Sequence, residues 1–135
     1  MSKLLKKILT EKAPSAIGPY SQAIMVPGYQ SLIFVSGQLP IDPKTGELIV
    51  GDIKELTKQT LDNIEAILKA SSSSLQNVVK TEVFLKDLKK DFAGMNEEYA
   101  KHFDIETPPA RQTIQVADLP KGSPLEISCI AVSNF

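Results

Sequence analysis

Alternation of apolar and polar residues with a period of two predicts most of the secondary structure of this chain. Runs rich in Val, Ile and Leu are separated by proline, glycine and aspartate, which is typical of short strands joined by turns. After a short N-terminal tail we expect a first edge strand, followed by a proline-containing bend. Further strands are predicted at residues 20–26, 31–36, 77–85, 111–117 and 125–133.

Two segments change the period to about 3.6 residues and are predicted to be helices. Asp52 stands three residues before Glu55, which is the spacing of a capping box at a helix N-terminus. The apolar stripe of this first helix is Leu56, Thr60, Leu61, Ile64, Ile67 and Leu68. The second helix is expected to begin near Asp91 and to end before the prolines that follow Thr107. Its stripe is Phe92, Met95, Tyr99 and Phe103.

The predicted order β-β-β-α-β-α-β-β describes one α+β domain over residues 1–135, a mixed sheet with two crossover helices packed on one face. Several strands are nevertheless apolar on both faces. In the strand at 77–85, alternation places Val79, Val83 and Leu85 on one face and Val78 and Phe84 on the other. A face rich in Val, Ile and Leu is not left in water, so we expect a second copy to cover it in a homo-oligomer with inward-facing sheets.

The charge balance argues against a protein that grips nucleic acid. The 135 residues carry 15 basic and 16 acidic side chains, and they form no basic stripe. The single cysteine, Cys129, excludes an internal disulfide and is expected to be a small buried hydrophobic residue. The single histidine, His102, is expected to be a solvated helix residue, and with Cys129 it is too little for a zinc site. We expect a cytoplasmic protein, because no stretch approaches the ~20 apolar residues that span a membrane.

The strongest local signal for chemistry is Arg111, which follows two prolines at the start of a predicted strand. Alternation places Arg111, Thr113 and Gln115 on one face. If the last two strands form a hairpin around Lys121, Glu126 lies some distance along the sheet from Arg111. An arginine and a glutamate that face one cleft can bind a small carboxylate and orient a polar reactant. The alternative is a plain Arg–Glu surface pair.

Eight short motifs stand in order along nearly the whole chain. They are GPYSQA (18–23), SGQLP (36–40), PKTGE (43–47), VKTEVFLKDL (79–88), PAR (109–111), QVA (115–117), LP (119–120) and LEI (125–127). Each motif alone is weak, but together they resemble the RidA (YjgF-type) family. The resemblance implies a chorismate-mutase-like fold and a homotrimer whose sheets form a central barrel, with ligand clefts between subunits.

The resemblance also implies an activity, the hydrolytic deamination of reactive 2-enamino and 2-imino acids to 2-oxo acids and ammonia. Substrates of the 2-aminoacrylate and 2-iminobutanoate type are implied, with no cofactor and no metal. Arg111 corresponds to the residue that binds the substrate carboxylate, and Glu126 to the residue that orients the attacking water. Tyr20, Gly37 and Asn96 correspond to further residues beside the ligand.

Two positions depart from the family pattern. Thr113, also placed at the ligand, stands where a cysteine is common, and Ser128 replaces a second acidic residue. Two other classes of function stay open. One is a non-catalytic trimer that binds small metabolites or holds unfolded clients. The other is an RNA-binding, ribonuclease-like inhibitor of translation, for which the chain lacks both a basic stripe and a pair of histidines.

Overall fold

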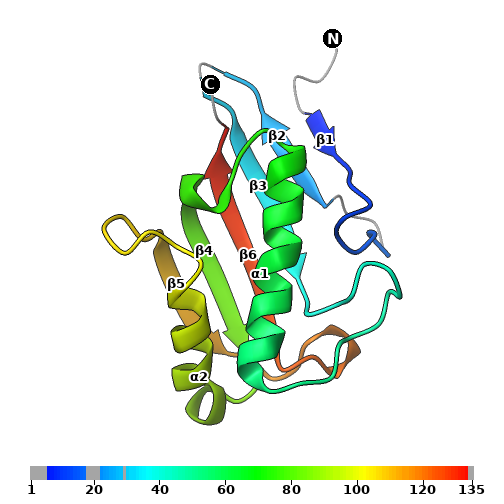
Figure 1. Ribbon diagram of the computed structural model, residues 1–135, viewed down its shortest axis with the longest axis vertical. Coiled ribbons are helices and arrows are strands. Elements are labelled where there is room, and N and C mark those ends of the chain that lie inside the picture. Colours follow the sequence, from blue (N-terminus) through cyan, green and yellow to red (C-terminus); the bar gives the residue numbers. More distant parts are fainter. Residues whose placement is uncertain (1–5, 18–21, 29, 134–135) are drawn as a thin grey trace.

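The computed structural model describes residues 6–17, 22–28 and 30–133, which form a six-stranded sheet with two helices (Figure 1). The strands are β1 (Lys6–Ile8), β2 (Ala23–Val26), β3 (Leu32–Gln38), β4 (Val78–Leu85), β5 (Ala110–Gln115) and β6 (Leu125–Val132). The helices are α1 (Ile53–Ala70) and α2 (Leu88–Ala100), and the 3-10 turns are η1 (Leu75–Asn77) and η2 (Pro120–Gly122). The predicted order of elements and the α+β fold class are confirmed.

The strands are arranged in the order β1-β2-β3-β6-β4-β5. All neighbours are antiparallel except β4 and β5, which are parallel and are connected through α2. The last two strands therefore do not form a hairpin, because β5 pairs with β4 whereas β6 pairs with β3 and β4. Every second residue of β6 is buried, which suits a central strand, whereas nearly all of β5 is exposed, which suits an edge.

Both helices lie on the same face of the sheet, as right-handed crossovers predict (Figure 1). The predicted capping box is present at α1: the Glu55 N–H donates to Asp52 Oδ1 at 2.9 Å, and the Asp52 N–H donates to Glu55 Oε1 at 3.4 Å. Helix α2 begins at Leu88, earlier than the predicted Asp91. The reason is that Asp87 caps it, accepting the Lys90 N–H at 3.1 Å.

A β-bulge interrupts the alternation at the start of β4. Val78 lies opposite Ala131 and Lys80 lies opposite Ile130, so Val79 is the extra residue. Val78 is 6% exposed and Val79 is 46% exposed. The predicted faces of these two valines are therefore wrong, because a bulge shifts one residue out of the strict period of two.

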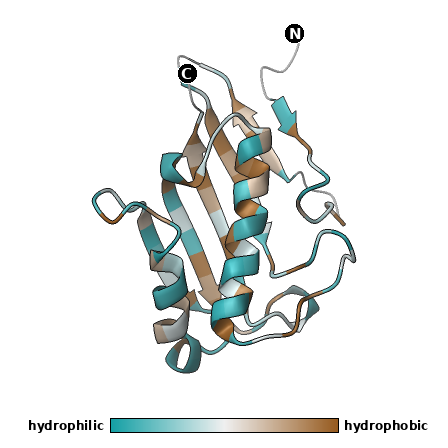
Figure 2. Ribbon diagram, in the orientation of Figure 1, coloured by the Kyte–Doolittle hydropathy of each residue, from teal (hydrophilic) through white to brown (hydrophobic). Residues whose placement is uncertain are grey.

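The two faces of the sheet differ in what covers them. Hydrophobic residues are concentrated along the central strands beneath α1, where the core lies (Figure 2). On the opposite face Leu32, Phe34 and Ile114 are 40%, 42% and 43% exposed in the single chain. That a second copy of the chain covers this exposed apolar face stays a prediction.

A buried asparagine connects α1 to the chain that leaves β3. The Asn63 Nδ2 group donates to the carbonyl oxygens of Leu39 and Ile41 at 3.1 and 2.8 Å, and Asn63 Oδ1 accepts from Gln59 at 2.9 Å. Asn63 is 1% exposed, so water cannot take over the hydrogen bonds that its amide donates to these carbonyl oxygens. The segment that Asn63 fixes also lines the larger pocket described below.

We expect Asn63→Ala to lower the free energy of unfolding by about 1–3 kcal/mol, because the two buried carbonyls lose their donor. Urea unfolding at fixed protein concentration measures the change. Asp62→Ala is the matched control on the same helix, since it removes only the exposed contact with Lys58 at 2.8 Å and is expected to cost less than about 0.5 kcal/mol. Equal effects of the two variants would contradict a structural role for Asn63.

Candidate active site

Glu126 occupies the second position of β6 and points to the face opposite the helices. Its strand neighbours Leu125 and Ile127 are fully buried on the helix-covered face, and Glu126 itself pairs with Phe84 of β4. Gly37 lies in the irregular stretch of β3 beside it. A Cβ at Gly37 would stand 2.5 Å from Glu126 Oε2, so only glycine lets the carboxylate lie against this backbone. The structure thus brings two of the predicted site residues together.

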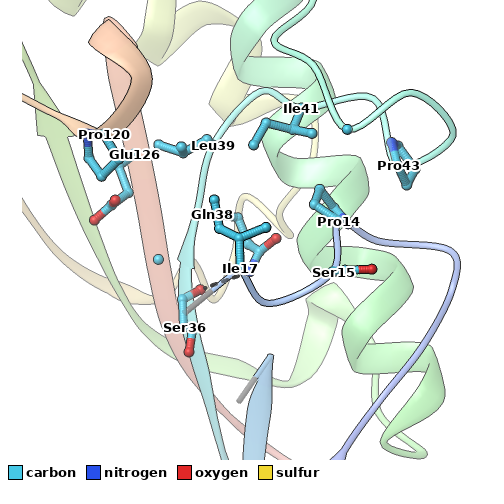
Figure 3. A pocket seen from close by; sticks show the side chains of 12 residues that line it. Pro14, Ser15, Ile17, Ser36, Gln38, Leu39, Ile41, Pro43, Pro120 and Glu126 are labelled. Carbon is cyan, nitrogen blue, oxygen red and sulfur yellow. Dashed lines mark hydrogen bonds between the residues drawn. The ribbon is translucent and has the colours of Figure 1, made fainter. Parts of the chain in front are cut away.

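Glu126 lies at one end of a pocket of about 470 Å³, with Pro43 at the other end (Figure 3). The remaining lining side chains are mainly apolar and include Leu39, Ile41 and Pro14. Burial raises the pKa of the Glu126 carboxyl above its ordinary value. A half-buried carboxylate with a raised pKa has the properties of a general base or of a group that holds water.

Arg111 lies in a different place, on the helix-covered side of edge strand β5. Its Nη1 group donates to Asn96 Oδ1 on α2 at 2.7 Å, and its Cζ atom stands 4.8 Å from the ring centroid of Tyr99. These residues line a second pocket of about 420 Å³, together with Pro108 and Pro109. Among the described residues, no carboxylate forms a salt bridge with Arg111. The predicted association of Arg111 with Asn96 at one site is present in the geometry.

Arg111 and Glu126 do not share a cleft within one chain. Arg111 pairs with Thr81 of β4, whereas Glu126 pairs with Phe84 of the same strand. Thr81 and Phe84 are three residues apart and so point to opposite faces of the sheet. The predicted cleft between the two charges is absent from the single chain, and so is the alternative of a surface ion pair.

The remaining predicted site residues have different outcomes. Thr113 lies on the same face as Arg111, opposite Val83, as alternation predicted. Its Oγ1 atom is buried and has no hydrogen-bond partner in the part of the chain that the structure describes. Thr113 is not among the residues that line either pocket. Tyr20 lies outside the described residues.

The single cysteine and the single histidine lie outside both pockets. The expectation of a buried Cys129 is confirmed, and burial raises the pKa of its thiol to about 12. The expectation of a solvated His102 is wrong, because its side chain is only 14% exposed and its Nε2 lies 2.7 Å from Glu98 Oε2.

In the described ranges no group of three or more His, Cys, Asp and Glu side chains is placed to hold a metal ion. No helix there is long and apolar enough to span a membrane.

Sequence reasoning missed the part that Tyr99 plays in the Arg111 pocket. The sequence pattern places Tyr99 in the apolar stripe of α2, and Tyr99 is indeed only 7% exposed. Its position is three residues after Asn96, which places both side chains on one side of the helix. That spacing was the available signal.

We expect native Cys129 to react with iodoacetamide at least about a thousandfold more slowly than the unfolded chain at pH 8. At a pKa of about 12, only about one thiol in ten thousand is ionised at that pH, against about one in four for an ordinary thiol. Mass spectrometry of alkylated protein, with and without denaturant, gives the two rates. Rapid alkylation of the folded protein would show that Cys129 is an accessible nucleophile.

Comparison with known proteins places the chain among relatives of similar length. The family model described as Endoribonuclease L-PSP matches residues 10–133. A RutC family protein of Pyrococcus abyssi is 55% identical over 124 residues, 92% of this chain and 94% of the relative. A Bos taurus 2-iminobutanoate/2-iminopropanoate deaminase is 49% identical over 135 residues, covering 99% and 95%. The crystal structure of Escherichia coli TdcF with bound serine superposes with a TM-score of 0.84 at 42% identity, covering 96% and 99%. The chain therefore belongs to the Endoribonuclease L-PSP family, whose members also carry the names RidA and YjgF.

Proposed function

We propose that this protein hydrolyses reactive 2-enamino and 2-imino acids, of the 2-aminoacrylate and 2-iminobutanoate type, to 2-oxo acids and ammonia. The observation that carries the proposal is the guanidinium of Arg111, which lines a pocket, is held by the neutral amide of Asn96, and has no acidic partner among the described residues. Such a group suits the carboxylate that all these substrates share. The deaminase from Bos taurus supports the same activity by its similarity.

In the proposed mechanism Arg111 binds the substrate carboxylate through two parallel N–H···O bonds, a geometry that lysine does not reproduce. Glu126 orients a water molecule toward the imine carbon and accepts a proton as the C–O bond forms. That proton passes to the nitrogen and gives a tetrahedral carbinolamine. Glu126 then transfers the proton of the new hydroxyl group to the same nitrogen, the C–N bond breaks as the C=O bond forms, and ammonia leaves with the 2-oxo acid as the other product. An enamine substrate first shifts its double bond to become the imine. The proposed reaction uses water and needs neither a cofactor nor a metal.

The proposal requires two chains for each site, because Arg111 and Glu126 lie on opposite faces of one sheet. A homotrimer supplies this arrangement when the Arg111 side of one subunit meets the Glu126 pocket of the next. Burial of the exposed apolar residues Leu32, Phe34 and Ile114 supports association through the uncovered face. The trimer and the cytoplasmic location remain parts of the proposal.

A non-catalytic trimer that binds 2-oxo acids or unfolded clients is the second candidate, since it uses the same Arg111 pocket. A coupled assay separates it from the enzyme. An amino-acid dehydratase generates the imine, and semicarbazide traps whatever the protein leaves. Faster loss of trapped imine supports the deaminase, and binding of 2-oxobutanoate without faster loss supports the binder. Ribonuclease chemistry by paired histidines has no support, because His102 is the one histidine of the chain.

We expect Glu126→Gln to reduce imine hydrolysis by roughly 10²–10⁴-fold, because the amide cannot accept the proton. Affinity for 2-oxobutanoate is expected to change only a few-fold. Since burial raises the pKa of Glu126, wild-type kcat/KM should fall as pH decreases through a value above the ordinary ~4.3 of glutamate. The variant should lack this decrease. A fully active Glu126→Gln variant would remove Glu126 from the mechanism.

Mixed trimers test whether each site uses two chains. We expect Arg111→Lys and Glu126→Gln subunits, each nearly inactive alone, to recover about one quarter of wild-type activity when refolded together in equal amounts. With random assembly, about one cleft in four then combines a native Arg111 with a native Glu126 from its neighbour. Activity no higher than that of the separate variants would contradict a shared cleft.

The double variant Arg111→Lys/Glu126→Gln, refolded with an equal amount of wild type, is the matched control. It should also leave about one quarter of the activity if clefts lie between subunits, but about one half if each chain carries a complete site. Light scattering on the same samples checks that the assembly is intact.

A further inference from the structure

We propose that Tyr99 is a positioning residue that fixes the orientation of the Arg111 guanidinium before a carboxylate arrives. The inference rests on the proposed function for the identity of the ligand. The contact itself is a feature of the described chain, since Arg111 Cζ lies 4.8 Å from the centroid of the Tyr99 ring. Tyr99 acts through Arg111 and is not proposed to touch the reacting atoms.

The Tyr99 ring is itself held rigidly. Tyr99 is 7% exposed, and its hydroxyl lies 2.7 Å from the Thr81 hydroxyl in a buried hydrogen bond. Thr81 stands directly beside Arg111 in the β4–β5 register. The ring of Phe103 packs against Tyr99, with a centroid separation of 4.5 Å. The ring is therefore fixed to the strand that neighbours the arginine it contacts.

The guanidinium is held by α2 in two distinct ways. Asn96 takes one of its N–H groups in a hydrogen bond of 2.7 Å, and the face of the Tyr99 ring lies near its carbon. The ring of Phe92 lies farther away, at 6.0 Å. A guanidinium carries five N–H donors, so one bond to Asn96 leaves a pair that can take a carboxylate. A ring on its face restricts its rotation without using any of these donors.

This arrangement lowers the entropy that a ligand must remove on binding. An arginine side chain has several rotatable bonds, and a free one loses their freedom when it grips a carboxylate. A ring that holds the guanidinium in advance removes part of that loss. The hydroxyl adds a further requirement, because phenylalanine would keep the ring but leave Thr81 without its partner.

Arg111 is the only arginine in the sequence, so its Nε–H group gives a single arginine side-chain signal in a ¹⁵N NMR spectrum. We expect Tyr99→Leu to remove the ring-current shift of this signal and to lower its heteronuclear NOE toward that of a mobile side chain. The affinity for 2-oxobutanoate should fall about two- to thirtyfold, the range of a cation–π contact. Tyr99→Phe, the conservative variant, should keep the shift and most of the affinity, and it should lower the NOE only in part because it loses the hydrogen bond to Thr81.

Phe103→Leu is the matched control, because it removes a ring that packs on Tyr99 rather than on Arg111. It keeps the Tyr99 ring against Arg111 and the hydrogen bond to Thr81, so the ring-current shift of the Arg111 signal should stay in place and its NOE should fall less than in Tyr99→Leu, at a similar loss of stability. If Tyr99→Leu does not fold, Thr81→Val tests the proposal in its place. This variant removes the hydrogen bond to the Tyr99 hydroxyl and should lower the Arg111 NOE in part. An unchanged Arg111 signal in the folded Tyr99→Leu variant, or in Thr81→Val when that variant must decide, would overturn the proposal.

The two proposals fail in different ways. If Arg111→Lys leaves 2-oxobutanoate affinity unchanged while the Arg111 signal still depends on Tyr99, the carboxylate role of Arg111 fails and its positioning by Tyr99 stands. If Arg111→Lys weakens binding while Tyr99→Leu changes neither signal nor affinity, the positioning fails and the proposed function stands.

Discussion

The alternation of β6 is the constraint on which the rest of the structure depends. Leu125, Ile127, Cys129 and Ala131 are all buried beneath the helices, so every residue between them faces the other way. Because β6 lies between β3 and β4, its alternation of buried and outward-facing residues also sets which residues of these two neighbours face the helices. It directs Glu126 to the uncovered face and against Gly37 of β3. Edge strand β5 carries the opposite parity at Arg111, which therefore contacts α2. The separation of the two charges is a consequence of burying the core.

Local features of the fold could be predicted from the sequence, and pairings between distant segments could not. The capping box at Asp52 and the stripe of α1 depend on residues within a few positions of one another. The position of β6 depends on which strand loses most by staying at an edge, and that is a property of the whole sheet. For this reason a hairpin of the last two strands could be neither predicted nor excluded from the sequence. The predicted faces of Val78 and Val79 are wrong for a different reason. Nothing in a run of two valines shows which of them is the extra residue of a β-bulge.

The candidate site shows the same division. Arg111, Glu126, Gly37 and Asn96 were identified from motifs, and the structure brings them together in pairs, Glu126 with Gly37 and Arg111 with Asn96. That Arg111 and Thr113 share one face of their strand was also predicted correctly. Whether Arg111 and Glu126 share a face could not be predicted, because parity along one strand says nothing about parity on a strand two positions away until the register is known. The surroundings of His102 depend likewise on Glu98, one helical turn away, and on burial that the stripe of α2 did not indicate.

Keeping the two charges apart has a chemical consequence. A direct Arg111–Glu126 ion pair would lower the pKa of the carboxyl and occupy the donors of the guanidinium, so that neither group would be available to a ligand. In the single chain the carboxyl instead has a raised pKa caused by burial, and the guanidinium bonds to a neutral amide. Asn96 is suited to this task because its oxygen fixes one N–H group without cancelling the positive charge. A carboxylate in its place would hold Arg111 more strongly, but it would compete with the substrate carboxylate of the proposed reaction. In the proposed reaction, the site uses an uncharged partner and an aromatic face to hold the cation that binds the substrate carboxylate.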